Sequence, residues 1–322
     1  MIILLPFFII FYVSSVFGFL SESELLDRKT RAAWQMPPQI QLLDISLRLI
    51  DLTDDYSCKE LLSEGKRKIY LFYYPSEGMM LKGYISLVPE QKSQAPVLFF
   101  LRGGTGMFGL MSPANRVSCY GPYTVIGLSY RGSVSPGKDE YGGNDVADVS
   151  NLIKYFPKLA EQLDISLNSH RYLLGMSRGG MQMFLLLNRY KNIASQFKAV
   201  MSISGLLDLK SLLNYRFDLA DMFRTEFNMT KDKEEQWILY RNPLANLNNI
   251  KRDLPIIIVQ ATKDNRVHLE DGKRMVKELI NQGFQDVRYK EIQDATHSLR
   301  NIENDVEIIW NLFNEENHTA PR

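Results

Sequence analysis

The stretch RYLLGMSRGG, residues 171–180, decides the expected fold of this chain. An apolar run comes first, Ser177 then stands between glycines in the pattern Gly-x-Ser-x-Gly, and the run MQMFLLLNRY follows. This pattern is typical of a sharp strand-to-helix turn that exposes a nucleophilic serine. We expect strained backbone angles at Ser177, with Gly179 and Gly180 letting strand and helix approach closely. A purely structural glycine turn that opens a buried helix is the alternative.

The flanking sequence predicts the sheet around this turn. Continuous apolar runs recur as APVLFFL, YTVIGLSY, FKAVMSI and LPIIIVQA, each bounded by turn residues or glycines. Runs of this length indicate strands buried on both faces, and therefore a parallel sheet. Helical spacing of apolar residues marks the intervening segments 144–163, 178–190, 268–282 and 300–314. The fold class predicted is α/β, a doubly wound, mostly parallel sheet with helices on both faces.

The predicted division of the chain has three parts. Residues 1–18 form a signal peptide or anchor, 19–65 an N-terminal extension, and 66–322 the catalytic domain. Within that domain, residues 206–252 interrupt the strand–helix rhythm, and we interpret them as a helical cap insertion over the carboxyl edge of the sheet, where such folds bind ligands.

The composition and net charge of the chain bear on which classes of partner it binds. The chain has 322 residues, 45% hydrophobic and 23% charged, with a net charge of +1. This balance is typical of a globular protein and gives no reason to expect nucleic acid or an anionic membrane surface as a partner. The sequence suggests no metal or organic cofactor.

The N-terminus predicts export. Residues 1–20 carry no charged side chain, which is typical of a secretory signal peptide, although no Lys or Arg precedes the apolar run. An uncleaved membrane anchor is the alternative. The protein is therefore expected to be periplasmic or secreted. Cys58 and Cys119 are then either a disulfide or two buried thiols that never meet.

A serine nucleophile needs a base and an orienting acid, which follow it in the chain in this type of site. His297 follows the predicted strand VRYKEI and precedes the last helix, which is the expected place of the base. Asp264 ends the run IIIVQATKD and is the expected acid, with a helix-capping role as the alternative and Asp208 as a rival acid. The remaining histidines are less suitably placed: His170, His268 and His318.

The oxyanion of an acyl-transfer reaction also needs amide donors. One is expected from the backbone of Arg178, the residue after the nucleophile, and the other from the turn Gly103-Gly104 after the strand VLFFL. A simple loop without a donor role is the alternative interpretation of these glycines.

Three blocks of sequence resemble the catalytic domain of the prolyl oligopeptidase family, in the α/β-hydrolase superfamily. These are YRGSVSPGKDEYGGNDVADV at 130–149, GMSRGG at 175–180 and NPLANLNNIKRDLPIIIVQATKDNRV at 242–267. The resemblance implies Ser177 as nucleophile, Asp264 as acid and His297 as base. It extends from about residue 66 to residue 315. Arg102 stands where the family has histidine, and Ser298 replaces a glycine that often follows the base.

The resemblance implies a serine hydrolase that cleaves peptide or ester bonds in small substrates. The roughly 65 residues ahead of the catalytic domain are too few for the β-propeller that screens peptides in this family. A carboxylesterase or lipase-like enzyme is therefore a strong alternative to a peptidase. A catalytically inactive binding protein of the same fold is a weaker one, since such a protein would be free to lose any of the three catalytic residues.

Overall fold

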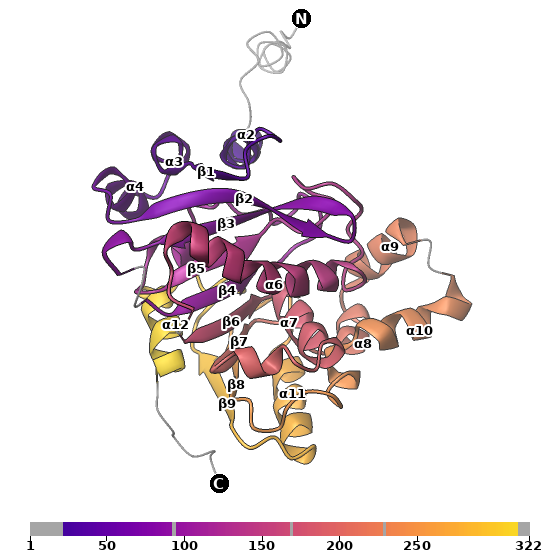
Figure 1. The fold of residues 1–322 in the computed structure, drawn as a ribbon. Coiled ribbons are helices and arrows are strands. Elements are labelled where there is room, and N and C mark those ends of the chain that lie inside the picture. The colour runs from indigo at the N-terminus through magenta and orange to yellow at the C-terminus, as the bar shows by residue number, and fades with distance from the viewer. Residues whose placement is uncertain (1–21, 92–94, 168–169, 228–229, 315–322) are drawn as a thin grey trace, which may run out of the picture.

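A computed structural model describes residues 22–91, 95–167, 170–227 and 230–314, and these form one nine-stranded sheet with helices on both faces (Figure 1). The strand order is β1-β2-β3-β5-β4-β6-β7-β8-β9. β1 to β3 pair antiparallel, as do β3 and β5, and the remaining pairs are parallel. The predicted α/β-hydrolase fold class is confirmed. The strands are β1 (Leu42–Asp44), β2 (Lys68–Ser76), β3 (Met79–Leu87), β4 (Val97–Leu101), β5 (Thr124–Leu128), β6 (Arg171–Met176), β7 (Ala199–Ile203), β8 (Ile256–Ala261) and β9 (Val287–Ile292).

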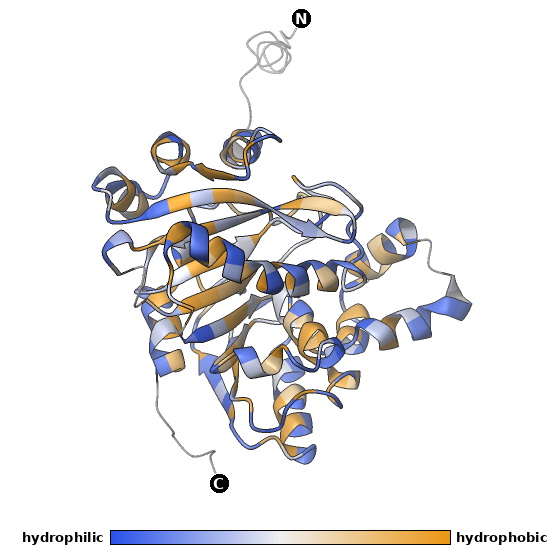
Figure 2. Cartoon of the chain, viewed as in Figure 1, coloured by the Kyte–Doolittle hydropathy of each residue, from blue (hydrophilic) through white to orange (hydrophobic). Residues whose placement is uncertain are grey.

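The central strands are apolar throughout because both of their faces are covered. Every residue of β4 is buried, and successive side chains enter different cores: Val97 and Phe99 join one cluster, whereas Leu98 and Phe100 join the other. This alternation follows from the two-residue side-chain period of a strand. Figure 2 shows the same result, with hydrophobic strands inside and hydrophilic surfaces on the outer helices.

Two sets of helices build the two cores. One core contains side chains from α6 (Asp145–Leu163), α7 (Arg178–Arg189) and α11 (Leu269–Asn281). The other contains side chains from the N-terminal extension, from α5 (Arg116–Cys119) and from α12 (Asp305–Asn314). The last helix begins later than the predicted residue 300, because a series of turns with left-handed residues at Leu299 and Asn304 precedes it.

The segment predicted as an N-terminal extension lies along one edge of the sheet. It comprises α2 (Glu22–Ala33), α3 (Ser46–Leu52) and α4 (Tyr56–Ser63), together with the short edge strand β1, which the sequence did not reveal (Figure 1). A disulfide joins Cys58 on α4 to Cys119 on α5, so one of the two alternatives for this pair is realised. The segment predicted as signal or anchor, residues 1–18, lies outside the described residues. In the described part of the chain, no helix has the length and apolar character needed to cross a bilayer.

The stretch predicted as a cap is helical. It contains α8 (Leu209–Leu213), α9 (Phe217–Glu226), α10 (Lys231–Arg241) and the short 3₁₀ helix η3 (Pro243–Ala245). Phe223 is fully buried at its centre, with ring centroids 4.6 Å from Tyr141 and 5.1 Å from Trp237. Aromatic packing of this kind attaches the cap to the segment that precedes α6.

Candidate active site

Ser177 occupies the turn between β6 and α7 in a strained conformation. Its φ is 56° and its ψ is −121°, a combination that residues other than glycine rarely adopt. The turn is very tight, since a Cβ atom at Gly179 would lie 1.9 Å from the carbonyl oxygen of Leu101. The predicted strain at the serine is therefore present, and local strain of this kind gathers at functional sites.

The structure brings Ser177, His297 and Asp264 into one hydrogen-bonded chain. The Nε2 atom of His297 lies 2.9 Å from Ser177 Oγ, and its Nδ1 atom lies 2.8 Å from Asp264 Oδ2. Each residue follows the carboxyl end of a different strand, β6, β9 or β8, and these ends share one edge of the parallel sheet. The arrangement can transfer a proton from the serine to an imidazole that a carboxylate holds in place.

Asp264 is held as a carboxylate. Burial alone would raise its pKa, but the hydrogen bond and charge of His297 and the amides of Arg266 and Val267 outweigh burial, so the pKa is lowered. Those amides donate to Asp264 Oδ1 at 2.8 and 3.0 Å, which leaves Oδ2 for the imidazole. The capping residue of α11 is His268, so the alternative role of Asp264 as the cap of that helix does not apply.

The rival acid, Asp208, has other partners. It caps α8 by accepting from the amide of Ser211 at 3.1 Å, and its other oxygen accepts from Arg274 at 3.0 Å. Asp208 therefore helps to fix the base of the cap to α11, while Asp264 contacts the imidazole.

Two of the other histidines have different surroundings. His268 stacks on Tyr215 with ring centroids 3.4 Å apart, and His170 is an exposed residue just before β6, at the opposite end of that strand from the serine. His318 lies outside the described residues.

The predicted oxyanion loop passes directly beside the nucleophile. A Cβ atom at Gly103 would lie 2.9 Å from Ser177 Cβ and 3.4 Å from its Oγ, so only glycine fits there. Gly104 has a φ of +73°. Arg178 is the first residue of α7, and its amide therefore has no acceptor one turn earlier in the helix. Of the residues predicted as donors, Gly103 and Arg178 therefore adjoin the serine, and Gly104 lines the same cavity.

Arg102, at the position where the family has histidine, holds the base of this loop. The side chain is 3% exposed and donates to the carbonyl oxygens of Gly103 at 2.8 Å, Gly106 at 3.0 Å and Ser129 at 2.7 Å. Burial lowers its pKa to about 10. The arginine that replaces the family's histidine therefore supports the glycine-rich loop from the end of β4.

A cavity of about 380 Å³ opens at Ser177 and His297. The cap supplies one wall, the glycine-rich loop another, and the ion pair of Arg216 with Asp218 lies at the surface, with a shortest distance of 2.6 Å. The apolar side chains that line the cavity come from four segments: Phe108, Tyr141, Leu206, Leu212, Leu219, Met222 and Val267. Phe223 lies behind this lining, in the core of the cap. The cavity can hold a small apolar group next to the serine.

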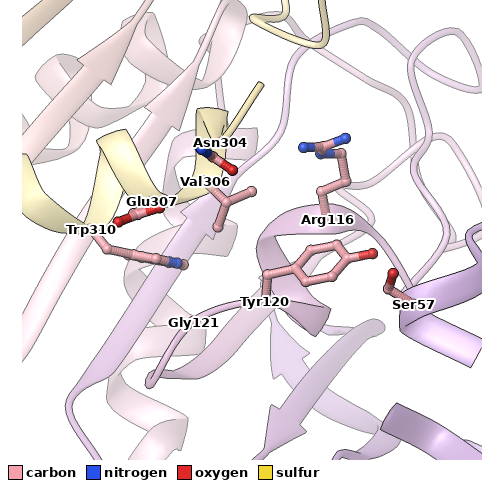
Figure 3. A pocket seen from close by; sticks show the side chains of 8 residues that line it. All are labelled: Ser57, Arg116, Tyr120, Gly121, Asn304, Val306, Glu307 and Trp310. Atoms are coloured by element: carbon pink, nitrogen blue, oxygen red, sulfur yellow. The ribbon is translucent and has the colours of Figure 1, made fainter. Parts of the chain in front are cut away.

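A larger cavity of about 520 Å³ lies elsewhere (Figure 3). Arg116 and Tyr120 face Val306 and Trp310 of α12 across it. No serine–histidine pair lines this cavity, so we assign the candidate active site to the smaller one.

Three residues beside Arg178 were not singled out from the sequence: Asp139, Tyr141 and Asp145. Arg178 is fully buried and pairs with both carboxylates, at 2.6 Å to Asp139. Burial alone would lower the pKa of Arg178, but the two carboxylates raise it. A sequence signal existed, because an arginine at the first position of an apolar helix requires acidic partners when buried. Among the described residues, no group of three or more potential metal ligands is present.

Comparison with known proteins agrees with this geometry. A model of the prolyl oligopeptidase family matches residues 123–315. An acylaminoacyl peptidase of Pyrococcus horikoshii superposes with a TM-score of 0.61 at 22% identity, over 84% of this chain and 45% of its own. A puromycin-hydrolysing peptidase of Mycobacterium tuberculosis gives 0.55 at 17% identity, over 76% of this chain and 37% of its own.

An esterase of Pyrococcus furiosus gives a TM-score of 0.51 at 15% identity, over 76% of this chain and 88% of its own. This chain spans less than half the length of the two peptidases. No curated protein sequence matches it. At these identities the superpositions show the fold, whereas the family model covers more than half of the chain, including all three residues of the hydrogen-bonded chain. The chain therefore belongs to the prolyl oligopeptidase family, whose catalytic domains are α/β-hydrolase serine hydrolases.

Proposed function

We propose that the protein is an exported hydrolase that cleaves peptide or ester bonds of small substrates through an acyl-enzyme. The observation that carries the proposal is the chain of hydrogen bonds from Asp264 through His297 to Ser177, at 2.8 and 2.9 Å, at the mouth of an apolar cavity. Such a chain converts a weakly nucleophilic hydroxyl into an effective one.

In the first half of the reaction, Ser177 Oγ attacks the substrate carbonyl carbon while its proton passes to Nε2 of His297. Asp264 accepts the Nδ1–H hydrogen bond and stabilises the imidazolium that forms. The negative charge on the carbonyl oxygen is bound by the amide of Arg178 and by an amide of the loop at Gly103 and Gly104. The amine or alcohol then leaves with the proton from Nε2.

In the second half, water replaces the leaving group. His297 removes a proton from the water as its oxygen attacks the acyl carbon, and the same imidazole returns a proton to Ser177 Oγ when the acid product departs. The serine and the imidazole are thereby restored to their starting states.

The lining of the cavity supports a small apolar acyl or side-chain group as the part of the substrate next to the scissile bond. Leu212, Leu219 and Met222 of the cap face it, and a volume of about 380 Å³ lies within the usual range for a small-molecule site. Because the cap is short, it can enclose such a group but not a long peptide.

Peptidase and esterase activity both need this machinery, and peptide cleavage is the first candidate because the chain belongs to a peptidase family. The small apolar cavity favours esterase activity as the second candidate. Binding without catalysis is the weakest candidate, since the hydrogen-bonded chain from Asp264 to Ser177 is intact.

The decisive experiment is covalent labelling by a fluorophosphonate. The wild-type protein should react, and Ser177→Ala should not, because the probe attacks an activated serine. Ser204→Ala is the matched control, since Ser204 directly follows the neighbouring strand β7 and also has a positive φ, 45°. Equal labelling of Ser177→Ala and wild type would show that Ser177 is not the nucleophile. A panel of acyl esters and aminoacyl amides then separates esterase from peptidase.

Export is supported by the uncharged apolar run at residues 1–20 and by a disulfide, a bond that persists in oxidising compartments. Fusion of residues 1–21 to a reporter that is active only outside the cytoplasm tests this part of the proposal. An inactive reporter retained in the cytoplasm would contradict it.

A further inference from the structure

Arg178 is a charged residue in an unusual position, fully buried and directly after the nucleophile. Its guanidinium bonds to Asp139 through two contacts of 2.6 Å and also pairs with Asp145. A buried charge is tolerated only when it is paired and hydrogen-bonded. Since both carboxylates lie inside the protein, the charge of Arg178 is used internally and is not offered to a substrate.

The same guanidinium reaches the glycine-rich loop. Its Nη1 atom donates to the carbonyl oxygen of Gly104 at 2.8 Å. Asp139 extends the connection, because its Oδ2 atom accepts from the amide of Gly106 at 2.7 Å and from Thr105 Oγ1 at 3.2 Å. The helix that begins after Ser177 is thus linked through a side chain to three consecutive residues of the loop.

The loop has little stiffness of its own. Gly104, Gly106 and Gly109 have φ values of +73°, +49° and +75°, conformations that glycine can leave easily because it has no Cβ. Its geometry beside Ser177 therefore depends on external contacts, and Arg178 supplies them from the side of the nucleophile.

Two aromatic rings pack against the guanidinium. Its central carbon lies 4.9 Å from the ring centroid of Tyr130 and 4.5 Å from that of Tyr141. A planar group with several donors suits such a site, whereas a lysine ammonium would not reproduce either the stacking or the paired hydrogen bonds.

We propose that Arg178 is a positioning residue that controls both halves of the oxyanion hole. Its amide is one donor, and its side chain, together with Asp139, holds the loop that carries the other donor. The inference rests on the proposed function and goes further by making the loop donor dependent on a buried charge pair.

The test compares Arg178→Met and Arg178→Lys with Arg131→Met. Arg131 is a matched control because it is also buried and pairs with a buried carboxylate of α6, Asp148, at 2.7 Å. Its other ionic partner is Glu140, at 3.8 Å, and within the described part of the chain it has no hydrogen bond to the glycine-rich loop. For a short acyl ester, both Arg178 variants should lose a factor on the order of 10² in kcat, the effect of losing one oxyanion donor, with KM changed by about threefold or less. Arg131→Met should retain kcat within about threefold of wild type, even if its Tm falls by as much as that of the Arg178 variants.

Affinity for a trifluoromethyl ketone provides a readout that a purely structural role would not change. Its tetrahedral adduct places an oxyanion in the hole, so Arg178→Met should weaken this inhibitor by the same factor as kcat. A folded Arg178→Met with wild-type kcat and inhibitor affinity would overturn the inference. So would equal losses in the Arg131 control.

Asp139→Asn is the second variant, because it keeps the volume of the side chain and is expected to fold if Arg178→Met does not. It should show the same split between kcat and KM, and an unchanged kcat in this variant would equally overturn the inference. Failure of the proposed function is distinguishable, because it would appear as a wild-type protein without fluorophosphonate labelling or hydrolysis.

Discussion

Of the two cavities described above, the smaller one and not the larger one contains the serine and the histidine. The smaller, of about 380 Å³, lies at the carboxyl ends of parallel strands, where Ser177 is strained and hydrogen-bonded to His297. The larger, of about 520 Å³, lies between α12 and residues around the disulfide, including Ser57 and Tyr120, the neighbours of the two cysteines. The groups that are able to react therefore lie at the carboxyl ends of the parallel strands and not in the cavity with the larger volume.

The surroundings of the two cavities explain this difference. Around the larger one, Arg116 pairs with Asp305 and Tyr120 donates to Asp55, whereas Arg116 Nε and Trp310 Nε1 are buried without a hydrogen-bond partner among the described residues. Around the smaller one, the buried ion pairs of Arg178 support a loop beside the nucleophile. The first set holds segments of the fold together, whereas the second set positions groups that can react.

The largest expected effect lies at the smaller cavity. Asp264→Asn should lower kcat by a factor on the order of 10⁴, because the wrong tautomer of His297 is then favoured. Asp208→Asn is the control, as its partners are Ser211, Arg274 and Asn242. Steady-state kinetics on one ester measure both, and a larger loss in the Asp208 variant would transfer the role of the acid.

The next effect belongs to the larger cavity and concerns stability. Replacing both Cys58 and Cys119 by alanine should lower the free energy of unfolding by about 4 kcal/mol, the chain-entropy value for the 61-residue separation that the bridge closes. Urea unfolding measures this loss, while kcat of the folded variant should stay close to that of wild type. A loss below about 1 kcal/mol would show that the bridge adds little beyond the surrounding packing.

Acidification should lower the stability of the fold through Asp139, which bonds to the loop beside the smaller cavity. Burial alone would raise the pKa of Asp139, but Arg178 and the amides of Gly106 and Tyr141 lower it to about 2. Because the folded-state pKa is below the usual value, the charged Asp139 stabilises the fold above about pH 4, by on the order of 2 kcal/mol, and this is lost as the pH falls toward 2.

Urea unfolding of wild type and Asp139→Asn between pH 7 and pH 3 checks this expectation, and the difference in unfolding free energy should shrink on acidification. Asp148→Asn is the control, since burial raises the pKa of Asp148 and its charge gives no such acid-sensitive stabilisation. A difference for Asp139→Asn that does not depend on pH would contradict the assignment.

A smaller effect should follow from the length of the substrate. Each added methylene of an acyl ester that enters the smaller cavity should contribute about 1 kcal/mol, so kcat/KM should rise several-fold per carbon until the cavity is full. Met222→Ala, which removes part of the lining, should change this dependence. A flat series from acetyl to octanoyl, together with rapid cleavage of an unfolded protein, would indicate an open endopeptidase instead.

The smallest effect is expected from filling the larger cavity. Ser57 is an exposed lining residue on α4, and Ser57→Trp should occupy part of the space. Because the proposed chemistry lies in the smaller cavity, kcat/KM should stay within about twofold of wild type. A tenfold change would show that the two cavities are coupled.

Local sequence patterns were sufficient for much of the fold and for the choice of candidate residues. Continuous apolar runs indicate parallel strands because such strands are covered on both faces, and residues at their carboxyl ends then share one edge. The candidate residues Ser177, Asp264 and His297 follow from this pattern without knowledge of the fold. The short strand β1 and the late start of α12 were not predicted, because a three-residue pairing and a series of turns have no periodic signal.

Periodicity and local motifs in the amino-acid sequence were enough to indicate the fold class, the family and the chain order of the candidate nucleophile, acid and base. The folded structure was needed to show which carboxylate faces His297, that Cys58 meets Cys119, and which acids neutralise Arg178. Hydrogen bonds and ion pairs act over about 3 Å, and here they join segments that lie far apart in the chain. Such contacts depend on how the loops pack, which no local pattern specifies.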